Sequence, residues 1–417
     1  MYLQLIMISK YKFFYLLLFC LLTTLPFAHA NKIKQFTEAF ASNVQKNLTA
    51  ESIPGGAYVI VRGDAIIDQK HFGYTDKTKR RSIDDNTVFR LASVSKTFAA
   101  TLTTMLAFEQ HLSLSDPITK YVPSFKLAKA GDADKIELAH ILSQSSGIMP
   151  NAFDNLLHEN WSMNKIIKQF KRINPICKPN QCYGYQNITY GLLEQVIELS
   201  QQKTYKTLLN ERIFEPLNMK NASLGINVYQ QKNSNTAKPH VLVQRKKTAK
   251  KNQKGLITHQ YIWRTVKVRP DFYKVPAAAG VNASITDLSE WLMANLGYKP
   301  KVLSPALLKL LTTPKINTKK DLKRRFWRKY LTDAHYALGW RVYQFKGHPI
   351  IYHGGWVEGF RAEIGYCPTL NIGFAFLINA ESNIISQLSS NFWSKAIEIF
   401  KKRSRPPSTI IHEKTLR

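Results

Sequence analysis

The sequence predicts an α/β fold of the α+β type, in which helices flank an antiparallel sheet and a large, mainly helical insert interrupts that sheet. Strand-like alternation of apolar and polar residues is concentrated near the two ends of the chain, at residues 56–72 and 336–378. Between about residues 106 and 331, helical spacing dominates instead. We therefore expect the first and last strands to share one sheet, with a small-molecule cleft between the sheet and the insert.

The central domain is expected to cover residues 31–400, with a sheet lobe at about 31–95 and 335–400 and a helical lobe at about 96–334. At the start of the sheet lobe, the periodicities predict an amphipathic helix at 33–47, a strand pair at Gly56–Arg62 and Ala65–Phe72 turned at Gly63–Asp64, a short strand at Thr87–Arg90 and a helix over Thr97–Phe108.

In the helical lobe, the periodic segments are Trp161–Phe170, Tyr190–Leu199, Thr286–Ala294 and Pro305–Leu311. Residues 228–275 are expected to be a mobile insertion. The chain then returns to strands, at Tyr336–Phe345, Ile350–His353, Phe360–Tyr366 and Ile372–Ile378, before an amphipathic helix over Ile384–Phe400.

The composition is that of a globular protein with a strong positive charge. The chain has 417 residues, a hydrophobic content of 44% and a net charge of +31, and so strong a positive field attracts polyanions. The basic runs at 245–254, 319–329 and 401–405 lack an amphipathic period, so we expect solvated loops or, alternatively, a contact with an anionic membrane surface. We expect no nucleic acid, because no zinc-knuckle spacing, aromatic RNA-binding strand or phosphate-cradling glycine loop is present.

The first 30 residues have the layout of a secretory signal peptide. Lys10 and Lys12 precede an apolar stretch over Phe13–Leu25, and Ala28-His29-Ala30 has the small residues of a cleavage site after Ala30. A retained membrane anchor is the alternative, although the apolar stretch is short for a membrane span. Five Asn-x-Ser/Thr sequons occur, and one of them contains Asn187, a candidate active-site residue described below. A glycan on Asn187 would fill that site, so a bacterial periplasm fits the chain better than a eukaryotic secretory route. The 401–417 segment reads as a basic tail.

Ser93 and Lys96 form the pattern Ser-x-x-Lys at the predicted start of a helix. Two residues three positions apart on a helix lie one turn from each other on the same face, so the amine can reach the hydroxyl and accept its proton. A short predicted strand precedes this pattern and a long apolar helix follows it. Ser93 is therefore the candidate nucleophile, at a helix end where backbone N–H groups are free.

Two later segments complete a set of three motifs: Tyr185-Gln186-Asn187 before a helical run, and His353-Gly354-Gly355 before two strand-like runs. In this order the motifs resemble those of the serine β-lactamase and penicillin-binding protein superfamily, and Tyr-x-Asn is similar to its class C β-lactamase branch. The resemblance covers residues 35–400. It implies a β-lactamase/transpeptidase-like fold and a serine hydrolase, without a cofactor, that cleaves β-lactam or D-alanyl peptide amides through an acyl-enzyme. With the signal-like N-terminus, we expect this hydrolase to be periplasmic.

The resemblance assigns the catalytic roles to Ser93, Lys96 and Tyr185. It leaves open whether Lys96 or Tyr185 is the base, because such a coupled set titrates as a unit. Asn187 would hold the Lys96 amine and a substrate amide. The backbone N–H groups of Ser93 and Trp356 would form the oxyanion hole.

The third motif supplies the residues that are expected to contact the substrate. Gly355 and Trp356 belong to the strand that the resemblance places against the substrate. His353 stands where a permanently cationic lysine would suit a carboxylate, and a histidine is largely neutral above a pKa of about 6.5. This departure weakens the case for a dedicated β-lactamase. Protonated His353, or a bidentate clamp by Arg361, would hold a substrate carboxylate, and a surface arginine is the alternative for Arg361.

The cysteines agree with an exported protein. Pro179 and Asn180 turn the chain between Cys177 and Cys182, so we expect a small disulfide loop there, with two free thiols as the alternative. Cys367 lies in an alternating apolar run and is expected to be a buried hydrophobe. Neither His-Glu-x-x-His nor paired Cys-x-x-Cys spacing is present, so no metal site is implied.

Other functions remain open at this stage. An esterase with the same nucleophile is one alternative, and a penicillin-binding protein that acylates and stays acylated is another. An envelope-surface protein whose basic face is its function is the third. A tagged penicillin distinguishes them, because a hydrolase turns it over, a trap retains the label and a surface protein does not react.

Overall fold

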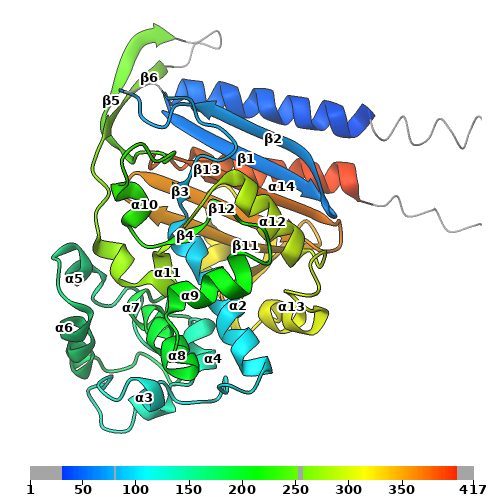
Figure 1. Cartoon of the computed structure of the whole chain (residues 1–417). Helices are drawn as coiled ribbons and strands as arrows, with labels where there is room; N and C mark the ends of the chain where they lie inside the picture. Colours follow the sequence, from blue (N-terminus) through cyan, green and yellow to red (C-terminus); the bar gives the residue numbers. More distant parts are fainter. Residues whose placement is uncertain (1–30, 79–80, 252–256, 402–417) are drawn as a thin grey trace, which may run out of the picture.

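The computed structural model describes residues 31–78, 81–251 and 257–401 (Figure 1). The predicted signal peptide, and all of the predicted basic tail except Lys401, lie outside these residues. In the described part of the chain, no helix is both long and apolar enough to cross a membrane.

One antiparallel sheet of eight strands, in the order β2-β1-β13-β12-β11-β10-β9-β8, forms the centre of the molecule. Its strands are β1 (Gly55–Arg62), β2 (Ala65–Gly73), β8 (Ile316–Asn317), β9 (Leu331–Tyr336), β10 (Arg341–Phe345), β11 (His348–Val357), β12 (Phe360–Cys367) and β13 (Ile372–Ile378). The N-terminal β1 pairs with the C-terminal β13, from Gly56 opposite Ile378 to Arg62 opposite Ile372. The prediction that the two ends of the chain share a sheet is confirmed.

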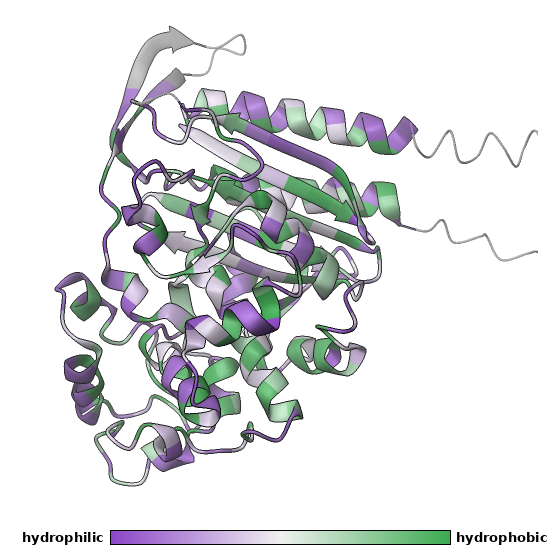
Figure 2. Ribbon diagram, viewed as in Figure 1, coloured by the Kyte–Doolittle hydropathy of each residue, from purple (hydrophilic) through white to green (hydrophobic). Residues whose placement is uncertain are grey.

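Helices cover both faces of the sheet, which explains why β1 is buried along nearly its whole length. Alternate residues of a strand point to opposite faces. Tyr58 and Ile60 join the aromatic cluster under the helix of residues 31–50 and α14 (Ile384–Phe400), where the rings of Phe374 and Phe392 stack at 4.1 Å. Figure 2 shows hydrophilic and hydrophobic residues alternating along the 31–50 helix, as an amphipathic cover requires.

The opposite face of the sheet carries the helix that begins two residues after the predicted nucleophile, Ser93. Ala57, Val59 and Val61 of β1 belong to the core that includes α2 (Ser95–Phe108) and α12 (Ile285–Asn295). The ring of Phe98 on α2 stacks on Trp291 of α12 at 4.2 Å. This packing holds the first turn of α2 close to the sheet.

The insert between β2 and β8 is mainly helical, as predicted. Its remaining helices are α3 (Ile118–Tyr121), α4 (Leu138–Leu142), α5 (Asp154–His158), α6 (Met163–Ile167), α7 (Ile188–Gly191), α8 (Leu193–Gln201), α9 (Tyr205–Leu209), α10 (Asn227–Gln230), α11 (Pro276–Ala279) and α13 (Pro305–Thr312). A small sheet in the order β3-β7-β4 supports the start of α2, with strands β3 (Phe89–Arg90), β7 (Val281–Ala283) and β4 (Ser223–Leu224).

Several parts of the fold differ from the predictions. The helix expected at Trp161–Phe170 is α6 followed by a 3-10 turn at Lys168–Arg172, and the strand expected at Ile350–His353 is the longer β11, which includes Gly354 and Gly355. The strand expected at Tyr336–Phe345 is two strands, β9 and β10, because the chain turns at Gly339, whose φ of +76° and close approach to Ala100 of α2 require a glycine. The segment 228–275, expected to be a mobile insertion, contains a two-stranded antiparallel ribbon of β5 (His240–Lys251) and β6 (Ile257–Thr265) that extends from the body of the molecule (Figure 1).

Candidate active site

Ser93 lies in a 3-10 turn, Ala92–Val94, between β3 and α2. The turn is fixed on both sides: the Leu91 N–H donates to the Val281 carbonyl (3.0 Å), and the Ser95 hydroxyl accepts from the Val281 N–H (2.9 Å). Ala92 has a φ of +49°, in the left-handed region that a residue with a side chain rarely adopts. This turn places Ser93 on the wall of a cleft of about 920 Å³.

Lys96 is fully buried, one helical turn from Ser93. Its Nζ lies 2.7 Å from Asn187 Oδ1, 3.1 Å from the Ala278 carbonyl and 3.4 Å from Ser93 Oγ. It also lies 4.6 Å from the ring centroid of Tyr185. The structure therefore brings the Ser-x-x-Lys and Tyr-x-Asn motifs together around one amine.

Burial lowers the pKa of Lys96 to about 7, with a smaller lowering by Arg341 and an opposing effect of the Asp154 carboxylate. An ammonium group has three N–H donors and no acceptor, whereas a neutral amine has two donors and one lone pair. In the neutral form, two N–H bonds can go to Asn187 and Ala278. The lone pair then faces Ser93 Oγ, which is the geometry that a general base needs.

Backbone hydrogen bonds fix the loop that carries Tyr185. The Asn151 N–H donates to the Tyr185 carbonyl (2.8 Å), and the side chain of Gln144 binds both the N–H (2.7 Å) and the carbonyl (3.2 Å) of Gln186. Burial raises the pKa of Tyr185 to about 12, and a hydrogen bond with Ser93 together with the charge of Arg341 opposes this rise. Tyr185 is thus a neutral phenol beside the serine hydroxyl at pH 7.

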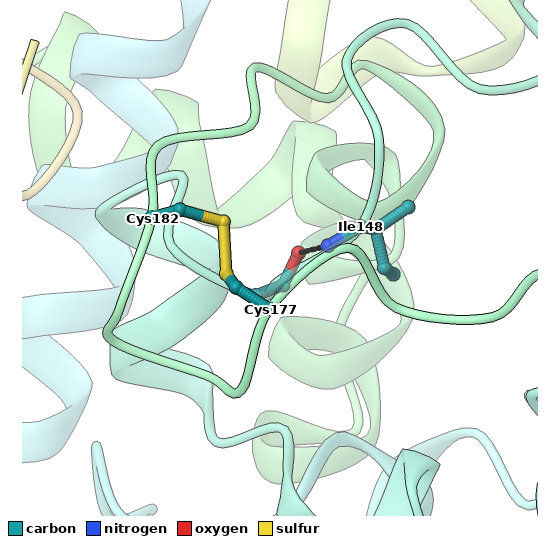
Figure 3. The surroundings of a disulfide bond; sticks show 4 residues. Ile148, Cys177 and Cys182 are labelled. Carbon is teal, nitrogen blue, oxygen red and sulfur yellow. Dashed lines mark hydrogen bonds between the residues drawn. A yellow bond between two sulfur atoms is a disulfide. The ribbon is translucent and has the colours of Figure 1, made fainter.

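Cys177 and Cys182 form a disulfide next to this loop, as the spacing predicts (Figure 3). The loop packs closely against the segment at Ile148: a Cβ at Gly147 would lie 2.2 Å from the Cys177 carbonyl oxygen, and one at Gly184 would lie 2.2 Å from that of Ile148. The disulfide loop therefore supports the position of the Tyr-x-Asn motif. Cys367 is a buried free thiol, in agreement with its prediction as a hydrophobe.

Strand β11 packs so closely against the Ser93 turn that position 355 has no room for a side chain. A Cβ at Gly355 would lie 2.1 Å from the carbonyl oxygen of Leu91 and 3.2 Å from Cβ of Ala92. Trp356 follows with its side chain 59% exposed, and it lines the cleft together with Ser93. This approach brings the backbone of β11 beside Ser93, the predicted nucleophile, where the oxyanion of an acyl transfer would form.

The structure corrects the expectation that His353 faces the substrate. The residue is 1% exposed, its Nδ1 lies 3.0 Å from the Gly354 carbonyl oxygen, and its Nε2 lies 3.0 Å from the Tyr336 hydroxyl. A carbonyl only accepts, so Nδ1 carries the proton and Nε2 accepts from Tyr336. Burial, with the charges of Arg341 and Lys96, holds the pKa of His353 well below its usual value. His353 is a neutral residue that holds β11, since both of its nitrogens are occupied.

Arg361 lines the same cleft. Its guanidinium lies over the Trp356 ring at 4.5 Å and donates to Asn383 Oδ1 at 2.8 Å. Its Nε is buried without a hydrogen-bond partner. The group is held in place from two sides at the wall of the cleft, and its role as a carboxylate clamp stays a prediction.

A family model described as Beta-lactamase matches residues 40–386. The chain belongs to the beta-lactamase family. Among solved structures, the octameric penicillin-binding protein homologue from Pyrococcus abyssi shares the fold, with a TM-score of 0.70 at 22% identity over 87% of this chain and 77% of that chain. The serine β-lactamase and penicillin-binding protein superfamily inferred from the three motifs is thereby confirmed, as is the fold class.

Curated relatives of this beta-lactamase family member are distant. Protein flp of Staphylococcus aureus strain MW2 is 24% identical over 350 residues, which cover 83% of this chain and 63% of that protein. The unguisins hydrolase ungD' of Aspergillus campestris strain IBT 28561 is 24% identical over 368 residues, which cover 86% of this chain and 63% of that protein. The chain thus spans less than two thirds of the length of these relatives.

Arg341 is a site residue that the motifs do not reveal. It begins β10, lines the cleft and forms an ion pair with Asp321. Its guanidinium carbon lies 5.4, 5.7 and 5.8 Å from the ring centroids of Tyr336, Tyr185 and Tyr183. Its charge lowers the pKa of both Lys96 and Tyr185. A fixed cation therefore stands beside the motifs, although His353 supplies none.

The sequence analysis also did not identify two other residues of the cleft, Arg324 and Asp154. Arg324, counted there within a solvated basic run, is held in the cleft wall by the hydroxyls of Tyr343 and Tyr352 and lies 3.8 Å from Glu363. Asp154 accepts a hydrogen bond from Asn187. No local pattern marks these residues, because each reaches the cleft only through contacts distant in sequence. Among the described residues, no cluster of three or more His, Cys, Asp and Glu could hold a metal ion.

Proposed function

We propose that the protein is a periplasmic serine hydrolase that acts through an acyl-enzyme on Ser93 and cleaves β-lactam or D-alanyl peptide amides. The observation that carries the proposal is the position of Lys96, whose buried Nζ lies 3.4 Å from Ser93 Oγ while two oxygen acceptors take its other hydrogen bonds. A lowered pKa makes this amine a base at neutral pH.

In the proposed reaction, neutral Lys96 takes the hydroxyl proton of Ser93 as Oγ bonds to the substrate carbonyl carbon. The N–H groups of Ser93 and Trp356 stabilise the resulting oxyanion. When the carbon–nitrogen bond breaks, the leaving nitrogen receives the proton through Tyr185 from Lys96. Water then attacks the acyl-ester, and its proton returns to Ser93 Oγ by the same groups.

The base assignment follows from the two pKa values. Lys96, with a pKa of about 7, is largely able to accept a proton at physiological pH, whereas Tyr185, with a pKa of about 12, is protonated. We propose Lys96 as the base and Tyr185 as the group that passes the proton to the leaving nitrogen.

Export to the periplasm is proposed from the signal-like first 30 residues. The disulfide between Cys177 and Cys182 supports it, because disulfides persist in oxidising compartments. On the substrate side, Arg361 is proposed to hold a substrate carboxylate, in place of His353.

The test uses one preparation of the protein with a chromogenic cephalosporin, a D-Ala-D-Ala peptide and a short-chain ester, and Ser93→Ala as the blank. We expect turnover of at least one substrate, an adduct of a fluorophosphonate probe on Ser93 by mass spectrometry, and loss of both in the blank. An adduct on another serine, or one that survives in the blank, would refute the assignment. A stable penicillin adduct without turnover would indicate a penicillin-binding trap instead.

A further inference from the structure

Trp356 exposes a larger fraction of its surface than any other tryptophan of the chain. Of the seven tryptophans, five are buried and Trp161 is partly buried, whereas Trp356 is 59% exposed. It lies on β11 and lines the cleft together with Ser93. Tryptophan is highly buried on average, so an indole left in contact with water on the wall of a cleft indicates a surface that a ligand covers.

Two contacts hold the indole of Trp356 in place. Its Nε1–H donates to Oε2 of Glu381 at 3.1 Å, and the guanidinium of Arg361, directly opposite on β12, lies 4.5 Å from the ring centroid. Both partners are themselves fixed, since Glu381 accepts from the Gly359 N–H at 2.7 Å and Arg361 donates to Asn383 at 2.8 Å. An aromatic group that is already fixed loses little conformational entropy when a ligand binds to it.

The contacts of the indole leave one of its faces open. Arg361 lies over one face and Glu381 contacts the N–H edge, so an exposed fraction of 59% requires the other face to be accessible. An aromatic face in a cleft binds either a cation or another ring. A second cation would lie across the ring from Arg361, with Arg341 in the same cleft, and charge repulsion disfavours it. The open face is therefore suited to an uncharged ring.

We propose that the side chain of Trp356 is a specificity-determining group whose open face stacks on an aromatic ring of the substrate. This inference rests on the proposed function for Ser93 and extends it, because the backbone N–H of Trp356 is the proposed oxyanion donor. A ring stacked on the indole of the same residue lies close to the reacting carbonyl, on the acyl side or on the leaving-group side. The substrates are thereby narrowed to esters and amides that carry an aromatic group near the scissile bond.

The experiment uses two matched pairs of esters, in which a phenyl ring is compared with a cyclohexyl ring of similar size. Methyl phenylacetate and methyl cyclohexylacetate carry the ring on the acyl side, whereas benzyl acetate and cyclohexylmethyl acetate carry it on the leaving-group side. For at least one pair, we expect kcat/KM of the wild type to favour the aromatic ester by roughly 3- to 10-fold, the usual gain from aromatic stacking beyond the buried area. The pair that shows the preference identifies the side of the substrate that carries the ring.

Three variants assign the preference to a side chain, and each is first tested for fluorophosphonate labelling of Ser93. Trp356→Leu removes the indole but keeps the backbone N–H, so neither pair should show a preference. Trp356→Phe keeps a smaller ring and should retain part of it. Phe272→Leu, which removes another ring from the cleft lining, is the control and should keep the wild-type ratio. Trp356→Met, which also lacks a ring, replaces Trp356→Leu if that variant is not labelled.

The possible results separate the inference from the proposed function. If Ser93 is labelled and the wild type shows no aromatic preference in either pair, the inference is refuted while the proposed function stands. If the preference survives in Trp356→Leu, or is lost in Phe272→Leu alone, another group contacts the ring and the inference is equally refuted. If Ser93 is not labelled and no ester is cleaved, the proposed function fails and the inference fails with it.

Discussion

The α-carbon of Gly355 and the carbonyl oxygen of Leu91 are so close that a Cβ at position 355 would lie 2.1 Å from that oxygen. Leu91 precedes the turn that carries Ser93, and Gly355 precedes Trp356 on β11. The distance between Ser93, the proposed nucleophile, and Trp356, the second proposed oxyanion donor, therefore depends on the absence of a Cβ at position 355.

We expect Gly355→Ala to displace β11 from the Ser93 turn and to lower kcat/KM by about 100-fold, the usual effect of losing an oxyanion donor. Hydrolysis of the preferred substrate and fluorophosphonate labelling would both be measured, with thermal unfolding as the check on folding. The control is Gly354→Ala, whose Cβ would meet the Tyr352 hydroxyl at 2.8 Å rather than a backbone atom. Equal loss in both variants would argue against the backbone contact as the cause.

The pH dependence of kcat/KM should report the pKa of Lys96. Neutral Lys96 is the proposed base and its pKa is about 7, so activity should rise as pH increases through about 7 and fall as the amine is protonated below it. Lys96→Met should lose this limb together with most of the activity. An acid limb that survives in Lys96→Met would assign the titration to another group.

Removal of the Arg341 charge should shift the acid limb of the pH profile of kcat/KM. Arg341 lowers the pKa of Lys96, so Arg341→Met is expected to raise it and to shift the acid limb to higher pH by about one pH unit. Arg341→Lys keeps a positive charge and should leave the limb closer to its original position. A variant that loses activity uniformly at all pH values, without a shift, would indicate that Arg341 acts only through packing.

Replacement of His353 by lysine should destabilise the protein. The lysine would bury a charge beside Arg341 and Lys96, where the pKa of His353 itself is held well below its usual value. We expect His353→Lys to lower the free energy of unfolding by roughly 3 kcal/mol, measured by urea denaturation. His71→Lys, at a half-exposed position paired with Asp85, is the control. A stable His353→Lys variant with a higher kcat/KM for carboxylate substrates would contradict this interpretation and would indicate that position 353 contacts the substrate carboxylate.

The ribbon of β5 and β6 should carry part of any binding to an anionic membrane surface. It exposes Arg245 and Lys246 next to Leu242 and Val243, which are 42% and 53% exposed. We expect the protein to bind anionic but not neutral phospholipid vesicles at low salt and to be released as salt rises, since charges are screened beyond about 10 Å at 0.1 M. Reversal of the charges at Arg245 and Lys246 should weaken flotation more than the same reversal at the exposed pair Lys126 and Lys129.

Equal flotation of the ribbon variant and the control variant would show that the ribbon has no special part in membrane binding. Equal binding to neutral and anionic vesicles by the wild type would show that charge does not drive it.

Elements with a strong local period could be predicted from the sequence. The strand pair Gly56–Arg62 and Ala65–Phe72 and the helix Ile384–Phe400 correspond closely to β1, β2 and α14, because side-chain alternation and helical spacing are visible within a few residues. The turn at Gly339 and the ribbon of β5 and β6 were missed. Gly339 is required by α2, more than two hundred residues earlier, and such a contact leaves no trace in the local pattern.

The amino-acid sequence by itself determined which chemical groups are available for catalysis and their order: the spacing of Ser93 and Lys96 already puts them on one helical face. Only the tertiary structure decided their charge states. The pKa of Lys96 is about 7 because the fold removes its amine from water, and the pKa of His353 is well below its usual value because burial removes its ring from water, with a further lowering by Arg341. Asp154 meets Asn187 across 33 residues. Protonation depends on burial and on charges several ångströms away, so it is a property of the packed chain and not of any local segment.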